Sequence, residues 1–283
     1  MTILGDILNT AKMNWDHLGD EVAGDRWEHI LEHTRLSEFG YDAFGYSPDV
    51  VKRMLPLAAF LYQRYFRVRA QGFENIPEGR VLLIANHSGQ LPFDAMMIVS
   101  SILLEGTPPR MIRSMVEKWI PSLPFASTFF TRLGQVPGIP ANCIRLLNSD
   151  EGILVFPEGA RGISKPWEQR YQLQGFGQGF MRIALETQTP IVPVALVGAE
   201  EQAPSIANLE SLARRLGMPS FPITPLGLVP LPTRYHLRFG KPMRFRGDPN
   251  GEDALILRRV NKVKDRIQQM LEQGLRERTH IFR

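Results

Sequence analysis

From Arg67 onward, short apolar runs alternate with stretches of helical periodicity, and this alternation constrains the fold more than any other feature. Such alternation is typical of β-α units around a largely parallel sheet. We therefore predict an α/β fold with a mostly parallel central sheet flanked by helices. The expected strands are Arg80–Ala85, Arg110–Met115, Gly152–Phe156, Ile191–Val197 and Tyr235–Phe239, and the expected intervening helices are Phe93–Leu104, Ala141–Asn148, Gly177–Thr187 and Ile206–Leu216.

Helical segments are predicted on both sides of this domain. The triplet Ser47-Pro48-Asp49 is typical of a helix start, with a capping residue ahead of a proline in the first turn. We predict a helical preface over 1–66, the α/β domain over 67–250 and a C-terminal helix within 251–283. The apolar stripe expected to pack that last helix is Leu255, Leu257, Val260, Val263, Ile267, Met270, Leu271 and Leu275.

Composition excludes several classes of protein. A single cysteine among 283 residues rules out a disulfide framework and a cysteine-rich metal site. No uncharged apolar run reaches the ~18–20 residues that a membrane-spanning helix needs. The start of the chain is acidic and lacks the basic region of a secretory signal. The net charge of +4 suits an anionic surface or acidic ligands, although it is also common in proteins with neither.

The first chemically suggestive segment follows the predicted strand that ends at Ala85. It reads Asn86-His87-Ser88-Gly89, and Asp94 comes seven residues after His87, in the first turn of a predicted helix. A neutral imidazole accepts a hydroxyl proton on one nitrogen while the other nitrogen donates to a carboxylate. The alternative is a strand-end histidine and an ordinary helix N-terminal acid, and this segment alone favours neither.

A second segment follows the strand that ends at Phe156. It reads Pro157-Glu158-Gly159-Ala160-Arg161, and Lys165 and Arg170 come soon after it. An arginine held in a glycine-containing turn suits bidentate binding of phosphate or carboxylate, and Glu158 is placed to orient it or to bind a ligand hydroxyl. The alternative is a surface turn with a salt bridge.

Together these segments resemble the motifs of the glycerol-3-phosphate and lysophosphatidic acid acyltransferases. Asn86-His87…Asp94 resembles that family's first motif, Phe156–Arg161 its third and Ile191–Val194 its fourth, in the same order. The resemblance implies transfer of a fatty acyl group from an acyl thioester, of coenzyme A or acyl carrier protein, to a glycerolipid hydroxyl in phospholipid biosynthesis. It implies His87 as general base and Asp94 as its orienting acid, without an acyl-enzyme. The expected substrate-binding residues are Asn86, Arg132, Glu158, Gly159, Arg161 and Lys165.

The chain departs from that family at two points. Six residues separate His87 from Asp94 instead of the usual four, and segment 134–142 lacks the arginine expected to bind the acceptor phosphate. Arg132 or Arg113 is a candidate to replace it. We predict a lysophospholipid acceptor such as lysophosphatidic acid. The alternatives are a neutral mono- or diacylglycerol or fatty alcohol, thioester hydrolysis, and a lipid-binding protein without turnover.

A lipid substrate directs attention to uncharged segments. The Pro-rich stretch Ser220–Thr233 carries no charge, and Met54–Phe66 and Pro121–Phe130 are largely apolar. These segments predict peripheral membrane attachment at the cytoplasmic face, with a rigid packed loop as the alternative for Ser220–Thr233. We expect no nucleic-acid partner, no cofactor beyond the thioester co-substrate and no metal. His29, Glu32 and His33 are interpreted as a polar helix face, and Cys143 is disfavoured as a nucleophile; the oligomeric state stays open.

Overall fold

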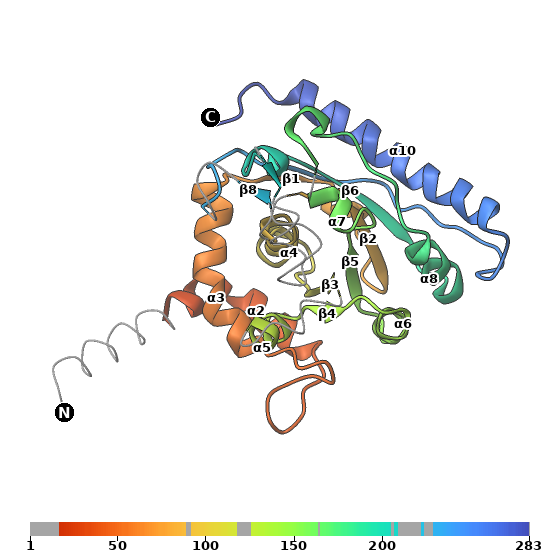
Figure 1. Cartoon of the computed structure of the whole chain (residues 1–283). Coiled ribbons are helices and arrows are strands. Elements are labelled where there is room, and N and C mark those ends of the chain that lie inside the picture. Colours follow the sequence, from red (N-terminus) through yellow and green to blue (C-terminus); the bar gives the residue numbers. More distant parts are fainter. Residues whose placement is uncertain are drawn as a thin grey trace, which may run out of the picture.

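The computed structural model describes residues 17–88, 92–117, 126–163, 165–204, 207–208, 222–223 and 229–282. Its centre is a seven-stranded sheet in the order β1-β9-β6-β2-β5-β3-β4 (Figure 1). Neighbouring strands are parallel except β6 and β9, which are antiparallel. The strands are β1 (Arg69–Gln71), β2 (Val81–Ala85), β3 (Ile112–Val116), β4 (Val136–Pro137), β5 (Gly152–Val155), β6 (Ile191–Val197) and β9 (His236–Phe239), and the separate pair is β7 (Ala207–Asn208) with β8 (Pro222–Ile223).

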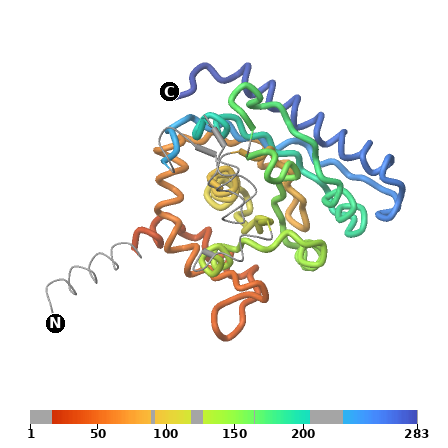
Figure 2. Tube along the Cα trace, in the orientation of Figure 1, coloured from red at the N-terminus to blue at the C-terminus, as the bar shows by residue number. Residues whose placement is uncertain are grey.

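The predicted mostly parallel α/β fold is confirmed, and helices cover both faces of the sheet (Figures 1 and 2). Along β2, Val81 and Leu83 pack towards α4, while Leu82 and Ile84 pack towards α6, α8 and α10. Successive side chains of a strand point to opposite faces, so a strand buried on both sides reads as a continuous apolar run. The helices are α2 (Asp25–Glu32), α3 (Pro48–Phe60), α4 (Phe93–Glu105), α5 (Ala126–Arg132), α6 (Pro140–Asn148), α7 (Ala160–Ile163), α8 (Gly179–Thr187) and α10 (Asp253–Glu277).

The helical preface packs against the α/β domain. Helix α3 begins at Pro48, as predicted, and continues into a π-helical turn, η1 (Leu61–Tyr65). Trp27 of α2 and Leu55 of α3 share a buried cluster with Leu103 of α4. The predicted boundaries at 66 and 250 stay predictions. Within the described ranges, every helix is too short or too polar to cross a bilayer.

The C-terminal helix α10 corrects part of the predicted apolar stripe. Ile256, absent from that stripe, is fully buried, whereas Leu255 and Leu257 are exposed. The other members of the stripe pack against the sheet at helical spacing. A helix with three apolar residues in succession presents only one of them to the core, and the pattern of 255–257 does not say which.

The remaining differences between the predicted and the observed elements concern short or polar strands and one predicted helix. Strand β1 is polar and three residues long, and β4 has only two residues, so neither leaves an apolar run to recognise. The helix expected over Ile206–Leu216 lies mostly outside the described residues; within it, Ala207–Asn208 forms β7.

Candidate functional site

The imidazole of His87 lies against a buried carboxylate. His87 follows β2 by two residues, and Asp94 is the second residue of α4. Asp94 Oδ2 lies 2.6 Å from His87 Nδ1 and also accepts from the Ser88 backbone N–H at 3.0 Å. The contact predicted between the two residues is therefore present across the longer loop. An ionised carboxylate only accepts, so Nδ1 carries the proton and Nε2 keeps its lone pair.

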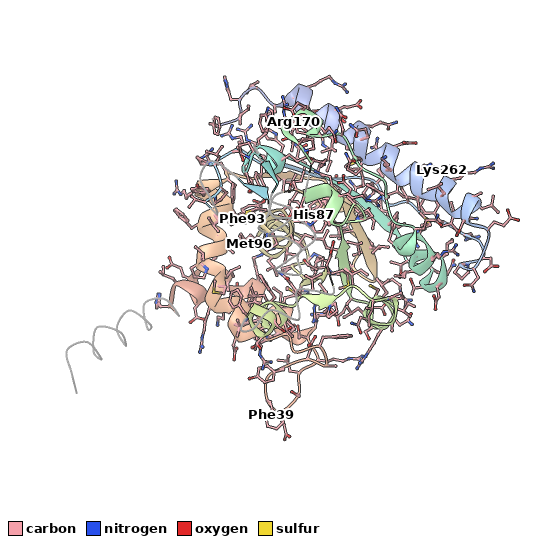
Figure 3. The ribbon with its side chains drawn as sticks, viewed as in Figure 1. Phe39, His87, Phe93, Met96, Arg170 and Lys262 are labelled. Carbon is pink, nitrogen blue, oxygen red and sulfur yellow. The ribbon has the colours of Figure 1, made fainter. Side chains whose placement is uncertain are left out.

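Two further contacts fix the imidazole ring. The ring of Phe156 stacks on it, with centroids 4.3 Å apart and planes inclined by 23°. A Cβ added to Gly162 of α7 would lie 2.9 Å from His87 Cβ. That spacing is closer than real Cβ contacts allow, so glycine lets α7 approach the histidine. Figure 3 shows His87 at the centre of the molecule, near Phe93 and Met96 at the start of α4.

The carboxylate of Glu158 holds the backbone around His87. Its two oxygens accept from the backbone N–H of His87 at 3.0 Å and of Gln174 at 2.8 Å. Lys165 lies 3.4 Å from this carboxylate and 2.8 Å from that of Glu200. All three charged side chains are at least 95% buried. Lys165 therefore compensates two buried carboxylates, which is a different place from the anion site predicted for it.

The surroundings act on the basicity of His87 in opposite directions. Burial lowers the pKa of the imidazole, while Asp94, Glu158 and Glu117 raise it, and the net pKa lies above its usual value. A raised pKa makes the His87 imidazole a stronger base. The imidazole must be neutral before it can accept a proton from a hydroxyl.

Two of the other predicted binding residues, Asn86 and Arg132, make contacts with other parts of the domain. The side-chain amide of Asn86 is fully buried and pairs with both backbone groups of Leu196, at 3.0 and 2.9 Å, so it joins β2 to β6. The guanidinium of Arg132 lies 3.4 Å from the ring centroid of Tyr41 and donates to the carbonyl of Gly45. These contacts engage Asn86 and Arg132 in the structure of the domain.

Gly159 lies in the turn before α7, and Arg161 lies within α7. The guanidinium of Arg161 is exposed and donates to the carbonyl of Gly175 at 2.8 Å, whereas Glu158 pairs with Lys165 instead of Arg161. Gly159 has φ +56°, a backbone conformation that glycine adopts most readily. Arg170 stacks on Trp167 at 4.5 Å and lies towards the top of Figure 3, away from His87.

The candidate replacement for the missing arginine, Arg113, is buried within the domain. Its guanidinium pairs with Asp42 and lies 3.3 Å from Glu151, and its Nε donates to the carbonyl of Gly134 at 2.9 Å. The side chain is 2% exposed. Arg113 thus anchors the loop before α3 rather than facing His87.

An apolar cavity of about 540 Å³ is lined in part by Phe156, the neighbour of His87 in the stacked ring pair. Glu117 forms another part of its wall, and its depth lies between α6, α8 and the sheet. Cys143 of α6 also lines it, and burial raises the pKa of this thiol to about 11. The thiol therefore stays protonated at neutral pH. Pockets of this size and apolar lining are typical of small-molecule sites.

Sequence reasoning missed Glu117, Gly162 and Glu200. Glu117 directly follows β3, so its position at a strand's carboxyl end was the available signal. Glu200 comes three residues after β6, so its position near that strand's carboxyl end was the available signal. Gly162 gives no signal of its own, because only the tertiary approach of α7 to His87 explains it.

His29, Glu32 and His33 lie together on α2. Their ligand-type atoms are within 4.8 Å of one another, and the two imidazole rings have centroids 4.3 Å apart. His33 Nδ1 lies 2.7 Å from the carbonyl oxygen of His29, so local hydrogen bonding already uses one ring nitrogen. The expectation of a metal-free protein stays a prediction.

Comparison with known proteins adds independent findings. A family profile described as "Acyltransferase" matches residues 67–197. An uncharacterized protein of Mycobacterium tuberculosis is 36% identical over 266 residues, covering 89% of this chain and 74% of that protein. A probable 1-acyl-sn-glycerol-3-phosphate acyltransferase of Mycoplasma pneumoniae is 28% identical over 199 residues, covering 65% of this chain and 69% of its own.

A solved structure shares the fold. The crystal structure of the 1-acyl-sn-glycerophosphate acyltransferase from Thermotoga maritima aligns with a TM-score of 0.52 at 18% identity, over 93% of this chain and 97% of that one. The matched fold is the mostly parallel sheet that carries His87 and Glu158 at the carboxyl ends of β2 and β5.

Proposed function

The chain belongs to the acyltransferase family, and from that premise we propose that it moves a fatty acyl group from a thioester to a hydroxyl of a glycerolipid. Family membership makes it an O-acyltransferase. The donor in this proposal is acyl-coenzyme A or acyl carrier protein, and the reaction takes place at the cytoplasmic face of a membrane.

The observation that carries the proposal is the contact between His87 Nδ1 and Asp94 Oδ2. Because Nδ1–H is held by the carboxylate, Nε2 is the proton acceptor. In the proposed reaction Nε2 takes the proton of the acceptor hydroxyl while its oxygen attacks the thioester carbonyl carbon. The tetrahedral intermediate collapses with cleavage of the C–S bond, and the proton on Nε2 passes to the departing thiolate sulfur.

The apolar cavity supports an acyl substrate. Its wall is mostly apolar and includes Phe156, the side chain stacked on the imidazole. In the proposal an acyl chain lies in this cavity and its thioester carbonyl extends past Phe156 towards His87. Burial of apolar surface at about 25 cal/mol per Å² supplies the binding free energy that holds the chain there.

The acceptor we propose first is a lysophospholipid such as lysophosphatidic acid. Arg161 supports it, because this exposed guanidinium belongs to the turn that also packs Gly162 against His87. A neutral acceptor, such as monoacylglycerol or a long-chain alcohol, is the second candidate. The engagement of Lys165, Arg113 and Arg132 elsewhere favours it.

One experiment tests these proposals together. Purified protein receives labelled palmitoyl-coenzyme A or palmitoyl-acyl carrier protein with lysophosphatidic acid, monoacylglycerol or hexadecanol, and the products are identified by mass. A phosphorylated acceptor predicts that Arg161→Ala raises the acceptor's KM far more than the donor's. Faster acylation of monoacylglycerol would select the neutral acceptor. Free fatty acid released without any acceptor would identify a hydrolase, and binding without turnover a lipid-binding protein.

A further inference from the structure

Three arginines and a histidine converge where β1 and β9 begin. Arg69 and His236 are partners in the parallel register of these strands, and Arg234 precedes β9 by two residues. Burial lowers the pKa of Arg234, and the charges of Arg69 and Arg67 lower it further. We call the residues that lie where β1 and β9 begin the arginine cluster (Arg67, Arg69, Arg234 and His236).

Among the described residues, no carboxylate forms an ion pair with Arg67, Arg69 or Arg234, although the charge of Glu277 raises the pKa of His236. The Arg67 guanidinium donates to carbonyl oxygens, including those of Pro232 at 2.6 Å and Phe282 at 3.2 Å. The acids near it are already engaged. Glu277 pairs with Arg238, and Glu201 pairs with Arg278. Three like charges thus lie together at an energetic cost that an anion would remove.

Three buried nitrogen atoms of this cluster have no hydrogen-bond partner. They are Nε of Arg67, Nε of Arg234 and Nε2 of His236. The large majority of buried polar atoms in folded proteins are hydrogen-bonded, so three such atoms in one place indicate an absent partner. Arg67 also has φ +45°, a conformation in which non-glycine residues are uncommon and which clusters at ligand sites.

The cluster lies at the same edge of the sheet as His87. His236 pairs with Val197, the last residue of β6, and Ala85 at the end of β2 pairs with Val194 of the same strand. Since β9 is the second strand from β2, the lateral separation is about 10 Å. A surface that binds at the cluster is therefore one from which a lipid can reach His87.

Two exposed apolar side chains belong to segments that lie beside the cluster. Val229 is 63% exposed and Phe282 is 52% exposed. They are tied to the cluster, because the Phe282 carbonyl accepts from Arg67, and the Tyr65 hydroxyl donates at 2.5 Å to Pro230, the neighbour of Val229. Exposed aromatic and aliphatic side chains around basic groups are typical of contact with a bilayer interface.

We propose that the arginine cluster binds the phosphate of an anionic phospholipid headgroup, with Val229 and Phe282 inserted into the surrounding interface. The phosphate oxygens accept from the guanidinium N–H groups of Arg69, which is exposed, and Arg234, which is half-buried, and neutralise the arginines. A soluble phosphate offers the same oxygens. The exposed apolar side chains beside the cluster favour the lipid, because inorganic phosphate has no apolar part that would contact them.

The test is vesicle binding by the full chain without substrate, so its result is independent of acyl transfer. The variant Arg69→Gln/Arg234→Gln removes two charges whose side chains make no hydrogen bond to the described residues. Its matched control is Arg244→Gln/Arg258→Gln, which removes two exposed charges elsewhere. Co-sedimentation is measured with phosphatidylcholine vesicles with and without phosphatidylglycerol, and circular dichroism checks folding.

We expect the cluster variant to lose roughly 25-fold in affinity for the anionic vesicles, since a basic residue at such a surface contributes about fivefold. The affinity of the control variant for the same vesicles should fall by less than about sixfold. Equal losses in both variants would reduce the effect to net charge and overturn the site. Binding of inorganic phosphate to the wild type but not the cluster variant, without any difference in vesicle binding, would overturn the lipid assignment.

Discussion

The Nδ1 atom of His87 and the Oδ2 atom of Asp94 lie 2.6 Å apart although six residues separate the two in sequence. Asp94 is fully buried, and its oxygens also accept from the backbone N–H groups of Ser88 and Ala95. Those bonds hold the carboxylate in place independently of the histidine. The imidazole is thus oriented by a group that is itself fixed at the first turn of α4.

Asp94→Asn should lower turnover by at least ~10²-fold with little change in donor KM, because an amide nitrogen cannot accept the Nδ1 proton and favours the wrong tautomer. His87→Ala should cause a loss of similar size. Both are measured by steady-state kinetics, with circular dichroism as the folding check. If Asp94 were only a helix-end acid, the asparagine variant would lose well under ~1 kcal/mol of stability and keep its activity.

Activity should fall on the acid side as His87 becomes protonated, at a pH above the ordinary range for histidine. Asp94, Glu158 and Glu117 raise the pKa of His87 against the effect of burial, so removing one of them lowers that pKa. Glu117→Gln should shift the acid limb of the kcat/KM profile to lower pH. Glu186 is an exposed residue of α8, and Glu186→Gln is the control that removes the same charge. Superimposable profiles for Glu117→Gln and wild type would show that Glu117 does not act on His87.

Cys143→Phe should shift acyl-chain preference towards shorter chains, because the new ring occupies the cavity between α6 and α8. Adding or removing one methylene in an apolar site changes discrimination by about 10- to 200-fold, so we expect at least a tenfold change in the palmitoyl-to-decanoyl ratio of kcat/KM. Cys143→Ala serves as control and should keep both activities, since the thiol is not a nucleophile in the proposed reaction. Inactivation by the alanine change would contradict that mechanism.

Lys165→Met should lower the free energy of unfolding by about 3–5 kcal/mol, because the buried carboxylates of Glu158 and Glu200 lose their shared cation. Urea denaturation measures the loss, and Lys262→Met on the exposed side of α10 is the comparison. If Lys165 instead bound the acceptor, the methionine variant would be as stable as the Lys262 variant and would show only a raised acceptor KM.

The parts of the fold that sequence predicts are those with local signals. Strand β6 is a seven-residue buried run, and α3 begins where Ser47-Pro48 predicts. The pairing of His87 with Asp94 is predicted by the resemblance to the acyltransferase motifs, because the segment alone also fits a strand-end histidine and a helix N-terminal acid. The direction of β9 was not predictable, because an apolar run reads the same whichever way its neighbour runs.

The ion pairs of charged residues could not be predicted from the sequence, for a physical reason. Lys165 looks like a free cation in sequence, but Glu200, 35 residues later, brings a buried carboxylate to 2.8 Å. Arg113 similarly depends on Asp42, 71 residues earlier. Ionic partners far apart in sequence leave no periodic or compositional trace, so the charges available to a ligand emerge only from the folded chain.

The tie between Arg67 and the carbonyl of Phe282 has a practical consequence for work with this protein. Together with the bond from the Arg234 backbone N–H to the carbonyl of Ile281, it fastens the segment after α10 beside the arginine cluster. A purification tag fused after residue 283 would therefore begin next to that surface, and a polyhistidine tail would add its own charge there. Placing the tag at the other terminus, or cleaving it, keeps vesicle measurements free of this interference.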